Sequence, residues 1–436
     1  MKKSLFWILF LGLILRLISL NQSLWLDEAT TAYVAGHFSF AEIITKFSPG
    51  DFHPPLYYLI LRGWSMIFAI SEVSVRIPSV VFGLLTVYLV FLIGKELVNR
   101  KTGLVAAVLL ATSGLHIYYS QEARMYALTA LLVSCLVYLF LKKKWVLFST
   151  FLVLVAMTDY VALLVIPVFW IAGRKDWRKL VISHLPLIFF FLLWSPVFIR
   201  QLTSGLGARG SNWWGILGKS SLKEILLIPV KFSFGRISLD NKWLYTLVTG
   251  AVSGFYIYIL SKAKKSSLLW LWFLFPAITA VILGLWLPVL SYFRLLFILP
   301  VFYLLLAKGA SKNKVFIMVI LVINLFSTAI YLFNPRFHRE NWRGLVSFVN
   351  KESINTNSLT LFVADSNMEA YRYYDSSAKI SGPGGIKSGF DQIRLMRYVQ
   401  PIFDPEDKAR FRIEDLGFKK MAEYDFNGVV VWRYVK

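Results

Sequence analysis

Long apolar runs, separated by short clusters of lysine and arginine, recur from the N-terminus to about residue 335. A helix needs about 20 apolar residues to cross the hydrocarbon core of a bilayer. The composition agrees, because 57% of the residues are hydrophobic and 16% are charged, whereas a soluble domain is about 25% charged. The pattern therefore predicts an α-helical polytopic membrane protein.

The net charge of +23 would suit a nucleic-acid partner if it covered one face of a soluble domain. Much of it lies instead in short clusters between apolar runs, such as Lys142-Lys143-Lys144. Clusters of this kind are typical of cytoplasmic loops under the positive-inside rule. We therefore expect a multi-pass protein of the cytoplasmic membrane, surrounded by membrane lipids and without a nucleic-acid partner.

The same charges predict an orientation. The first span, at residues 4–20, follows Lys2-Lys3 and starts in the cytoplasm, with Arg16 reaching to the outer interface. Residues 56–70 are ambiguous, but a span there would place the later basic clusters outside, so we predict a juxtamembrane helix. About eleven spans result, with the C-terminus outside. The other spans are 77–97, 102–118, 126–141, 145–157, 161–171, 180–198, 243–260, 268–287, 293–307 and 315–333.

Two segments outside the spans have a distinct character. Residues 200–242 form a long predicted outer segment, in which the Trp213-Trp214 pair indicates contact with the membrane interface. Residues 336–436 are polar and are predicted to form a small extracytoplasmic α/β domain, after a transmembrane domain at 1–335. Strands are expected at 359–365 and 429–435, and a helix at 341–351.

The first outer loop, residues 21–76, contains the adjacent acids Asp27 and Glu28. Acids beside a membrane span are costly unless they are solvated or do chemistry. A carboxylate fixed beside an acceptor can act as a general base for its hydroxyl. An alternative stays open, in which Asp27 starts a short helix and Glu28 interacts favourably with the helix dipole.

Cationic and aromatic residues are predicted on the same side of the membrane. His53, Arg124 and Arg294, the last with Tyr292 nearby, are candidate ligands for a phosphate group, and Glu122 is a second acid.

Structural alternatives remain open for each of these segments. His53 would be an interface residue, Pro54-Pro55 would start a helix, and Glu122 would pair with Arg124. Arg62 and Arg76 are interpreted as interfacial residues, the tyrosines 118, 119 and 126 as an aromatic belt, and Asp159 as a turn residue.

Four segments together resemble a known family: LWLDEA…Y at 24–33, HPPLYY at 53–58, SEVSVRIPS at 71–79 and YYSQEARMYAL at 118–128. They resemble the bacterial polytopic glycosyltransferases of the GT-C fold, the group of the protein O-mannosyltransferases and the lipid A aminoarabinose transferases. The resemblance is clear over residues 1–175 and weaker up to 335.

This resemblance implies an inverting transfer of a monosaccharide from a polyprenyl-phosphate donor to a lipid, glycan or protein acceptor. Asp27 would be the general base, with Glu28 beside it and Glu122 at the position of the second acid. His53 stands where the aminoarabinose transferases have a lysine, and Arg294 matches a late basic residue on the phosphate side. SQEAR replaces an acid-x-acid pair, which weakens the case for a metal; a divalent metal stays open and no other cofactor is implied.

Two other classes of function are considered. A lipid or polysaccharide transporter would have two related halves, which the hydropathy pattern does not show. A membrane scaffold would depend on residues 336–436, whereas an enzyme whose chemistry lies on the spans would keep some activity without them.

Overall fold

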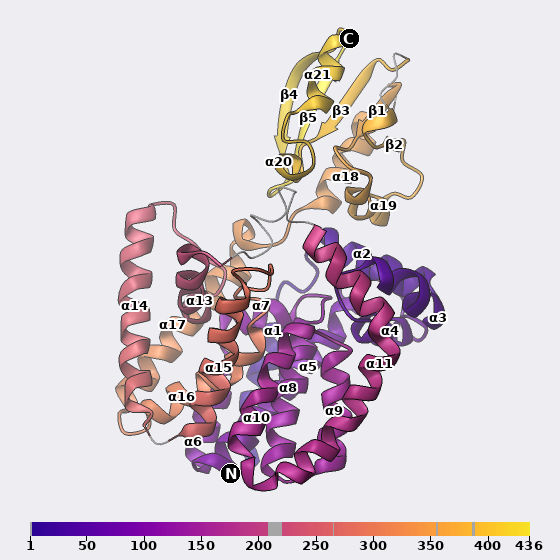
Figure 1. The fold of residues 1–436 in the computed structure, drawn as a ribbon. Coiled ribbons are helices and arrows are strands. Elements are labelled where there is room, and N and C mark those ends of the chain that lie inside the picture. The colour runs from indigo at the N-terminus through magenta and orange to yellow at the C-terminus, as the bar shows by residue number, and fades with distance from the viewer. Residues whose placement is uncertain (1, 208–219, 265, 355, 386–388) are drawn as a thin grey trace.

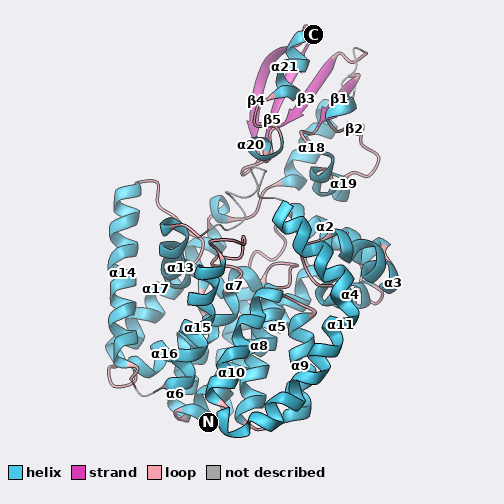
Figure 2. Cartoon of the chain, in the orientation of Figure 1, coloured by secondary structure: helices cyan, strands magenta, loops and turns pink. Residues whose placement is uncertain are grey.

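The computed structural model describes residues 2–207, 220–264, 266–354, 356–385 and 389–436. A large bundle of helices carries, at one end, a smaller domain with a five-stranded sheet (Figures 1 and 2). The N-terminus lies at the opposite end of the bundle from this domain (Figure 1). The predicted fold class, a helical polytopic protein with a small C-terminal α/β domain, is confirmed.

Helices lie at every predicted span. Among the described residues, four are long and apolar enough to cross a membrane, and a bent pair adds a fifth if it is one span; the others are shorter. The four are α5 (Ile77–Leu97), α11 (Trp177–Gly207), α14 (Lys242–Lys262) and α17 (Lys314–Phe333), the pair is α6 (Arg100–Ala111) with α7 (Gly114–Ser120), and the shorter ones are α1 (Lys2–Leu17), α8 (Tyr126–Leu141), α9 (Trp145–Ala156), η4 (Tyr160–Val165) with α10 (Ile166–Ala172), α15 (Ser267–Leu283), and η7 (Leu296–Ile298) with α16 (Leu299–Gly309).

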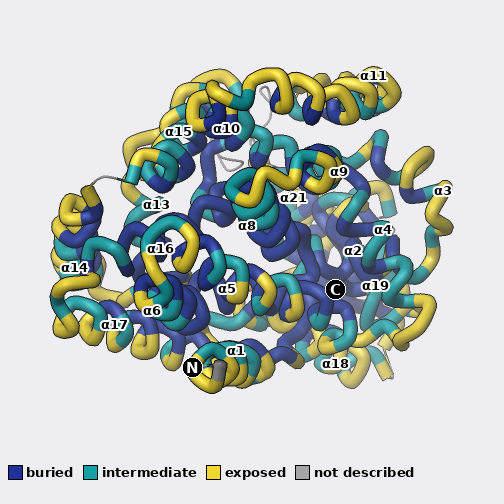
Figure 3. Tube along the Cα trace, turned by 90° about the horizontal axis from the view of Figure 1, so that it is seen from below, coloured by how far each residue is buried: buried dark blue, intermediate teal, exposed yellow. Residues whose placement is uncertain are grey.

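The surface of the bundle is apolar. Figure 3 shows exposed residues along the outer helices α11, α14 and α17, and buried residues along α5 and α8 inside. Leu192 and Leu193 on α11 and Leu247 on α14 are among the large hydrophobic side chains left exposed. Lipid is the solvent that stabilises such a surface, so the bundle is a membrane domain.

Close packing inside the bundle depends on small residues. Gly94 of α5 and Gly103 of α6 face each other, and a Cβ atom on Gly94 would lie 2.7 Å from the Cα of Gly103. Small residues allow helix backbones to approach this closely in membranes.

Basic turns gather at the end of the bundle away from the C-terminal domain. Lys142 pairs with Glu96 at 2.5 Å, and Lys143 pairs with Asp176 at 3.0 Å, which joins three turns of the bundle. This grouping agrees with the predicted alternation of the spans.

A break between α6 and α7 bends the chain by 64°. A broken helix leaves carbonyl groups without partners, which other groups must satisfy in a membrane. Arg16 donates to the carbonyl of Ala111 at 3.1 Å, and Asn324 of α17 donates to that of Leu109 at 2.8 Å. The predicted interfacial position of Arg16 is therefore wrong: its side chain is fully buried at the break.

The first outer loop folds into short helices at the end of the bundle nearest the C-terminal domain (Figure 1). The segment predicted as juxtamembrane forms a helix of 10 residues, too short to span a membrane. Pro55 directly precedes this helix, as the alternative for Pro54-Pro55 proposed. The elements are α2 (Leu26–His37), α3 (Phe40–Glu42), η1 (Ile43–Phe47), η2 (Ser48–Gly50), α4 (Leu56–Ser65) and η3 (Ser74–Arg76).

Where it is described, the predicted outer segment 200–242 is largely helical. α11 continues to Gly207, and α13 (Leu222–Phe234) packs against α14 and α17. The Trp213-Trp214 pair lies outside the described residues.

The C-terminal domain has a sheet with strand order β2-β1-β3-β5-β4. β1 pairs in parallel with β2 and β3, while β5 runs antiparallel to β3 and β4. The two predicted strands correspond to β1 and β5, and the predicted helix to α18. The elements are α18 (Trp342–Glu352), β1 (Ser358–Leu361), α19 (Glu369–Tyr374), β2 (Ile380–Ser381), β3 (Gln392–Met396), α20 (Gln400–Phe403), α21 (Lys408–Asp415), β4 (Lys419–Asp425) and β5 (Val430–Val435); the 3₁₀ turns η8 (Pro335–Phe337), η9 (Asp365–Asn367) and η10 (Pro383–Gly385) connect them.

Candidate active site

Asp27 and Glu28 both lie in the first turn of α2, but their side chains have different surroundings. Successive residues of a helix point about 100° apart. The Asp27 side chain keeps 40% of its surface exposed, whereas that of Glu28 is fully buried. Both acids also lie where the helix dipole favours negative charge, which agrees with the structural alternative for them.

Glu28 is the centre of a buried ion network formed by Glu28, Arg76, Glu122 and Arg339. Arg76 donates to both carboxylate oxygens, from Nε at 2.8 Å and from a terminal nitrogen at 2.5 Å. The backbone N–H of Ala123 donates to Oε1 at 2.8 Å. Burial alone would raise the pKa of Glu28, but Arg76 and Arg339 lower it below its usual value. Arg76 is therefore wrongly predicted as an interfacial residue.

Arg339 joins the two buried acids. Its side chain lies 3.3 Å from Oε2 of Glu28 and 3.3 Å from Oε2 of Glu122. Burial raises the pKa of Glu122 to about 7, although Arg339 acts in the opposite direction. Glu122 thus pairs with Arg339, and the expected pair with Arg124 does not form.

The open carboxylate cluster consists of Asp27, Asp51, His53, Tyr58 and Arg124. A terminal nitrogen of Arg124 lies 3.4 Å from Oδ2 of Asp27 and 3.5 Å from Nδ1 of His53, and its other terminal nitrogen lies 3.4 Å from the Tyr58 hydroxyl. The Tyr58 hydroxyl donates to Asp51 at 2.7 Å. The predicted residues Asp27, His53 and Arg124 therefore do come together.

The sequence analysis does not identify Asp51 as a site residue, although it lies two residues before His53. Its Oδ1 is 3.6 Å from Nδ1 of His53. Burial tends to raise the pKa of Asp51, but hydrogen bonding and the charge of His53, with the charge of Arg124, lower it to about 2. A carboxylate that stays ionised here stabilises the positive charge of its neighbours.

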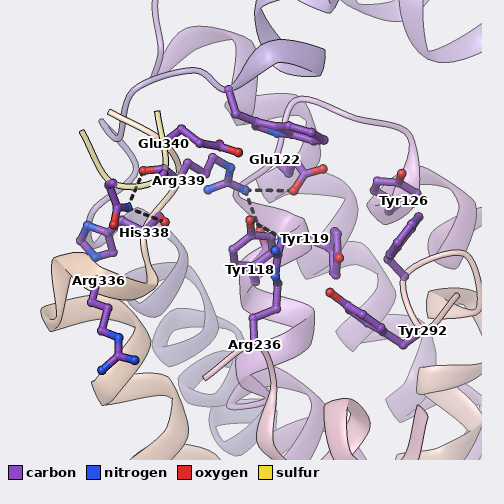
Figure 4. Close-up of a pocket in the computed structure, with 14 residues that line it drawn as sticks. Tyr118, Tyr119, Glu122, Tyr126, Arg236, Tyr292, Arg336, His338, Arg339 and Glu340 are labelled. Atoms are coloured by element: carbon purple, nitrogen blue, oxygen red, sulfur yellow. Dashed lines mark hydrogen bonds and ion pairs between the residues drawn. The ribbon is translucent and has the colours of Figure 1, made fainter. Parts of the chain in front are cut away.

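A cavity of about 490 Å³ lies between the end of the bundle and the C-terminal domain. Figure 4 shows its lining, with Tyr119, Tyr126 and Tyr292 on one side and Glu122, Arg339 and Glu340 next to them. The lining consists of Trp25, Tyr118, Tyr119, Glu122, Tyr126, Arg236, Tyr292, Phe293, Arg336, His338, Arg339, Glu340, Asn427 and Gly428. The three tyrosines interpreted as an aromatic belt are thus buried walls of this cavity.

Arg236 is one of the cationic residues that line the cavity. It follows α13, and its guanidinium lies over the ring of Tyr118, 4.5 Å from the centroid, while donating to the hydroxyl of the same residue at 2.6 Å. Tyr118 is its only hydrogen-bond acceptor within the described ranges. Nothing in the sequence distinguished Arg236 within a long outer segment.

Tyr292 lines the cavity as well, whereas Arg294 does not. Arg294 donates to the carbonyl of Pro288 and lies within electrostatic reach of Tyr126 and Asp159. Asp159 accepts from the backbone N–H of Val161 at 2.9 Å, which agrees with its interpretation as a turn residue. Arg294 and Tyr292 are thus neighbours in sequence with different surroundings.

A metal site does not emerge from the side chains. Across the described parts of the chain, no group of three or more His, Cys, Asp or Glu residues is arranged to hold a metal ion. The acids Glu28 and Glu122 are instead neutralised by arginines.

Comparisons with known proteins identify the fold. Residues 52–199 match the model of the dolichyl-phosphate-mannose-protein mannosyltransferase family. ArnT from Cupriavidus metallidurans, bound to undecaprenyl phosphate, has a similar structure, with a TM-score of 0.58 and 10% identity over 99% of this chain and 97% of that one. The archaeal oligosaccharyltransferase AglB from Archaeoglobus fulgidus, in complex with an inhibitory peptide and a dolichol-phosphate, has a TM-score of 0.55 and 10% identity, over 99% of this chain and 74% of that one. A search of curated proteins finds no match. The chain therefore has the GT-C fold that its sequence resembles.

Proposed function

We propose that this chain is an inverting glycosyltransferase, which moves a monosaccharide from a polyprenyl-phosphate donor to an acceptor hydroxyl at the outer face of the cytoplasmic membrane. The observation that carries the proposal is a partly exposed carboxylate, Asp27, within electrostatic reach of Tyr126, which lines an arginine-containing and tyrosine-containing cavity at the end of a membrane bundle. The fold supports it, because ArnT and AglB are solved with undecaprenyl phosphate and a dolichol-phosphate, respectively.

Asp27 is proposed as the general base. Arg124 lies 3.4 Å from one of its oxygens, and the exposure of the side chain leaves room for an acceptor hydroxyl. An ionised carboxylate held in place by a cation can take the hydroxyl proton as the new bond forms. Glu28 is enclosed by donors on both oxygens and is proposed to position the helix start instead.

Arg236 and Tyr292 are proposed to hold the donor phosphate. Arg236 lines the cavity with Tyr118 as its one hydrogen-bond acceptor among the described residues, and an arginine fork suits phosphate oxygens. Arg124 is already engaged by Asp27, and Arg294 by a backbone carbonyl, so these two are proposed to add positive potential, together with His53.

A single displacement follows from this arrangement. The acceptor oxygen attacks the anomeric carbon, its proton passes to Asp27, and the bond from the anomeric carbon to the phosphate oxygen breaks. Attack on the face opposite the leaving phosphate inverts the anomeric configuration. Negative charge grows on the phosphate in the transition state, where the arginines stabilise it more than in the ground state.

The proposed location follows from charge. Basic turns such as the one with Lys142 and Lys143 lie away from the cavity, and under the positive-inside rule this supports a cavity and a C-terminal domain outside the cell. A donor linked to a lipid suits that side, because nucleotide sugars stay in the cytoplasm.

The test is transfer by the purified full-length chain in liposomes, with a panel of labelled polyprenyl-phosphate sugars and hydroxyl-bearing lipid, glycan and peptide acceptors. Asp27→Asn is expected to lower transfer by about 1,000-fold or more, because the base is lost. Asp415→Asn, an exposed acid of the C-terminal domain, is the matched control and keeps full activity.

The anomeric configuration of the product, measured by NMR, tests inversion. Full activity of Asp27→Asn would contradict the assignment of the base, and absence of transfer from every donor would contradict the function.

A further inference from the structure

We infer that the C-terminal domain is part of the active site: through Asn427 it holds Arg339 in place, and Arg339 in turn positions Glu28 and Glu122. The inference rests on the proposed function and adds two positioning residues to it. Both lie in residues 336–436, which the sequence suggested as a domain separate from the chemistry.

Arg339 lies in the short connection between α17 and α18, where the chain leaves the bundle. Its side chain is nearly fully buried and contacts Glu28 and Glu122, which come from different parts of the bundle end. Its backbone N–H donates to the side chain of Gln22 at 3.1 Å. The connection therefore forms an inner wall of the site.

Asn427 holds this connection from the other side. It lies at the tip of the β4–β5 hairpin, and its amide nitrogen lies within 3.3 Å of three carbonyl oxygens, those of Pro335, His338 and Arg339. Its φ angle of +55° is in the left-handed region, which asparagine tolerates better than most residues. One side chain thus contacts three carbonyl groups of the same turn of backbone, of which that of Pro335 also accepts from the backbone N–H of His338.

A second set of contacts holds the segment before Asp27. The hydroxyl of Tyr374 in α19 accepts from the backbone N–H of Leu24 at 2.8 Å and from Ser23 at 3.1 Å. It also lies 3.1 Å from a carboxylate oxygen of Glu72, and Arg343 pairs with the same oxygen at 3.3 Å. The C-terminal domain therefore contacts two segments next to the ion network: the connection that carries Arg339 and the segment that precedes Asp27.

These contacts link the position of the C-terminal domain to the position of the proposed catalytic residues. If the hairpin releases the connection, Arg339 loses its fixed backbone and two buried acids lose a shared counter-charge. Glu28 is the neighbour of Asp27 on the same helical turn, so a shift of Glu28 moves the proposed base. Misplacement of a reacting group by about 1 Å can lower a rate about 100-fold.

Two variants of Asn427 test the hydrogen bonds of its side-chain amide separately from its backbone conformation. Asn427→Gly keeps the left-handed conformation and removes the three hydrogen bonds, and Asn427→Asp keeps the shape but removes the donor. Both are expected to lower kcat roughly tenfold or more, with a smaller change in the KM for the donor. Lys408→Gln, an exposed residue of the same domain, is the matched control and keeps full activity.

Variants of Arg339 test the link to the acids. Arg339→Gln is expected to lower kcat about 100-fold and to shift the pH profile of activity, because Glu122 loses its counter-charge. Arg339→Lys is expected to restore part of the rate, and adding Glu122→Gln to Arg339→Gln is expected to remove the shift. A merely structural residue would leave the pH profile unchanged.

Hydrogen exchange in the full chain provides a readout independent of transfer. In Asn427→Gly, exchange is expected to rise in residues 335–341 and also in 21–28 of the distant first loop. Wild-type exchange and wild-type kcat in Asn427→Gly and Arg339→Gln would overturn the inference. If the wild type transfers no sugar, the proposed function fails, while unchanged exchange in 21–28 would refute the coupling separately.

Discussion

The buried ion network and the open carboxylate cluster start from two adjacent residues of one helix and differ in almost every respect. Glu28 has no exposed surface, accepts hydrogen bonds from Arg76 and a backbone N–H, and forms an ion pair with Arg339. Asp27 keeps 40% of its side chain exposed and, among the described residues, has a single ion pair, with Arg124. The difference indicates that one acid assembles the loop and the other is free to react.

The buried ion network and the open carboxylate cluster also differ in how their charges are compensated. The network contains two acids and two arginines in a place without solvent, where an unpaired charge is strongly destabilising. The open cluster contains a further acid, Asp51, whose pKa is lowered to about 2 although burial opposes it, mainly through His53. In this cluster the Asp27 side chain is 40% exposed, whereas those of Asp51, His53 and Arg124 are 17%, 20% and 7% exposed.

The largest expected effect is on stability, from breaking the network. Arg76→Gln leaves Glu28 buried with one arginine fewer, and is expected to lower the free energy of unfolding by about 3–5 kcal/mol. Thermal unfolding in detergent measures it. Asp27→Asn, with its partly exposed ion pair, is expected to change stability by about 1 kcal/mol or less.

A double variant sharpens this comparison. Arg76→Gln combined with Glu28→Gln leaves no uncompensated acid at position 28, and should recover much of the lost stability. Equal losses for Arg76→Gln and Asp27→Asn would show that the two acids are not distinct.

The next effect is on the transition state. Arg236→Gln is expected to lower kcat about 100-fold, because a donor to the developing phosphate charge is lost. Arg236→Lys keeps the charge without the planar fork, and should lose about tenfold. Steady-state kinetics with the active donor measure both variants, and a change confined to the KM for the acceptor would contradict this role.

The smallest effect is the pH dependence of stability that Glu122 contributes. Burial raises its pKa from 4.5 to about 7, so the folded protein binds more protons than the unfolded chain between these values. Its contribution to stability therefore falls as the pH rises from about 4.5 to about 7. Glu122→Gln should remove this decline in melting temperatures measured between pH 5 and 8, and an unchanged slope would argue against the raised pKa.

Local patterns were enough for much of the fold. Runs of apolar residues located each predicted span of the bundle, although not α13, and strand-like patches located β1 and β5. β4 was not predicted, because its strand Lys419–Asp425 is largely polar and exposed, as suits an edge strand. β3 is fully buried, yet Arg394 interrupts its apolar run.

Parts of the site were also visible in the sequence. Asp27, His53 and Arg124 were singled out from their residue types and from the side of the membrane on which they lie, and they form one cluster. Arg339 had one usable signal, its place in a polar segment directly after the last span. Arg236 had none that separated it from neighbouring charges.

The sequence by itself determined that the chain is a membrane bundle with an α/β domain. The length of each apolar run and the charges that flank it are local properties, and they decide directly which segments enter a bilayer. Only the tertiary structure decided which charges are buried. Arg76 pairs with an acid 48 positions away, and Arg339 with one 217 positions away. Such contacts depend on how helices pack and how the C-terminal domain docks, so no window of sequence distinguishes a buried arginine from an interfacial one.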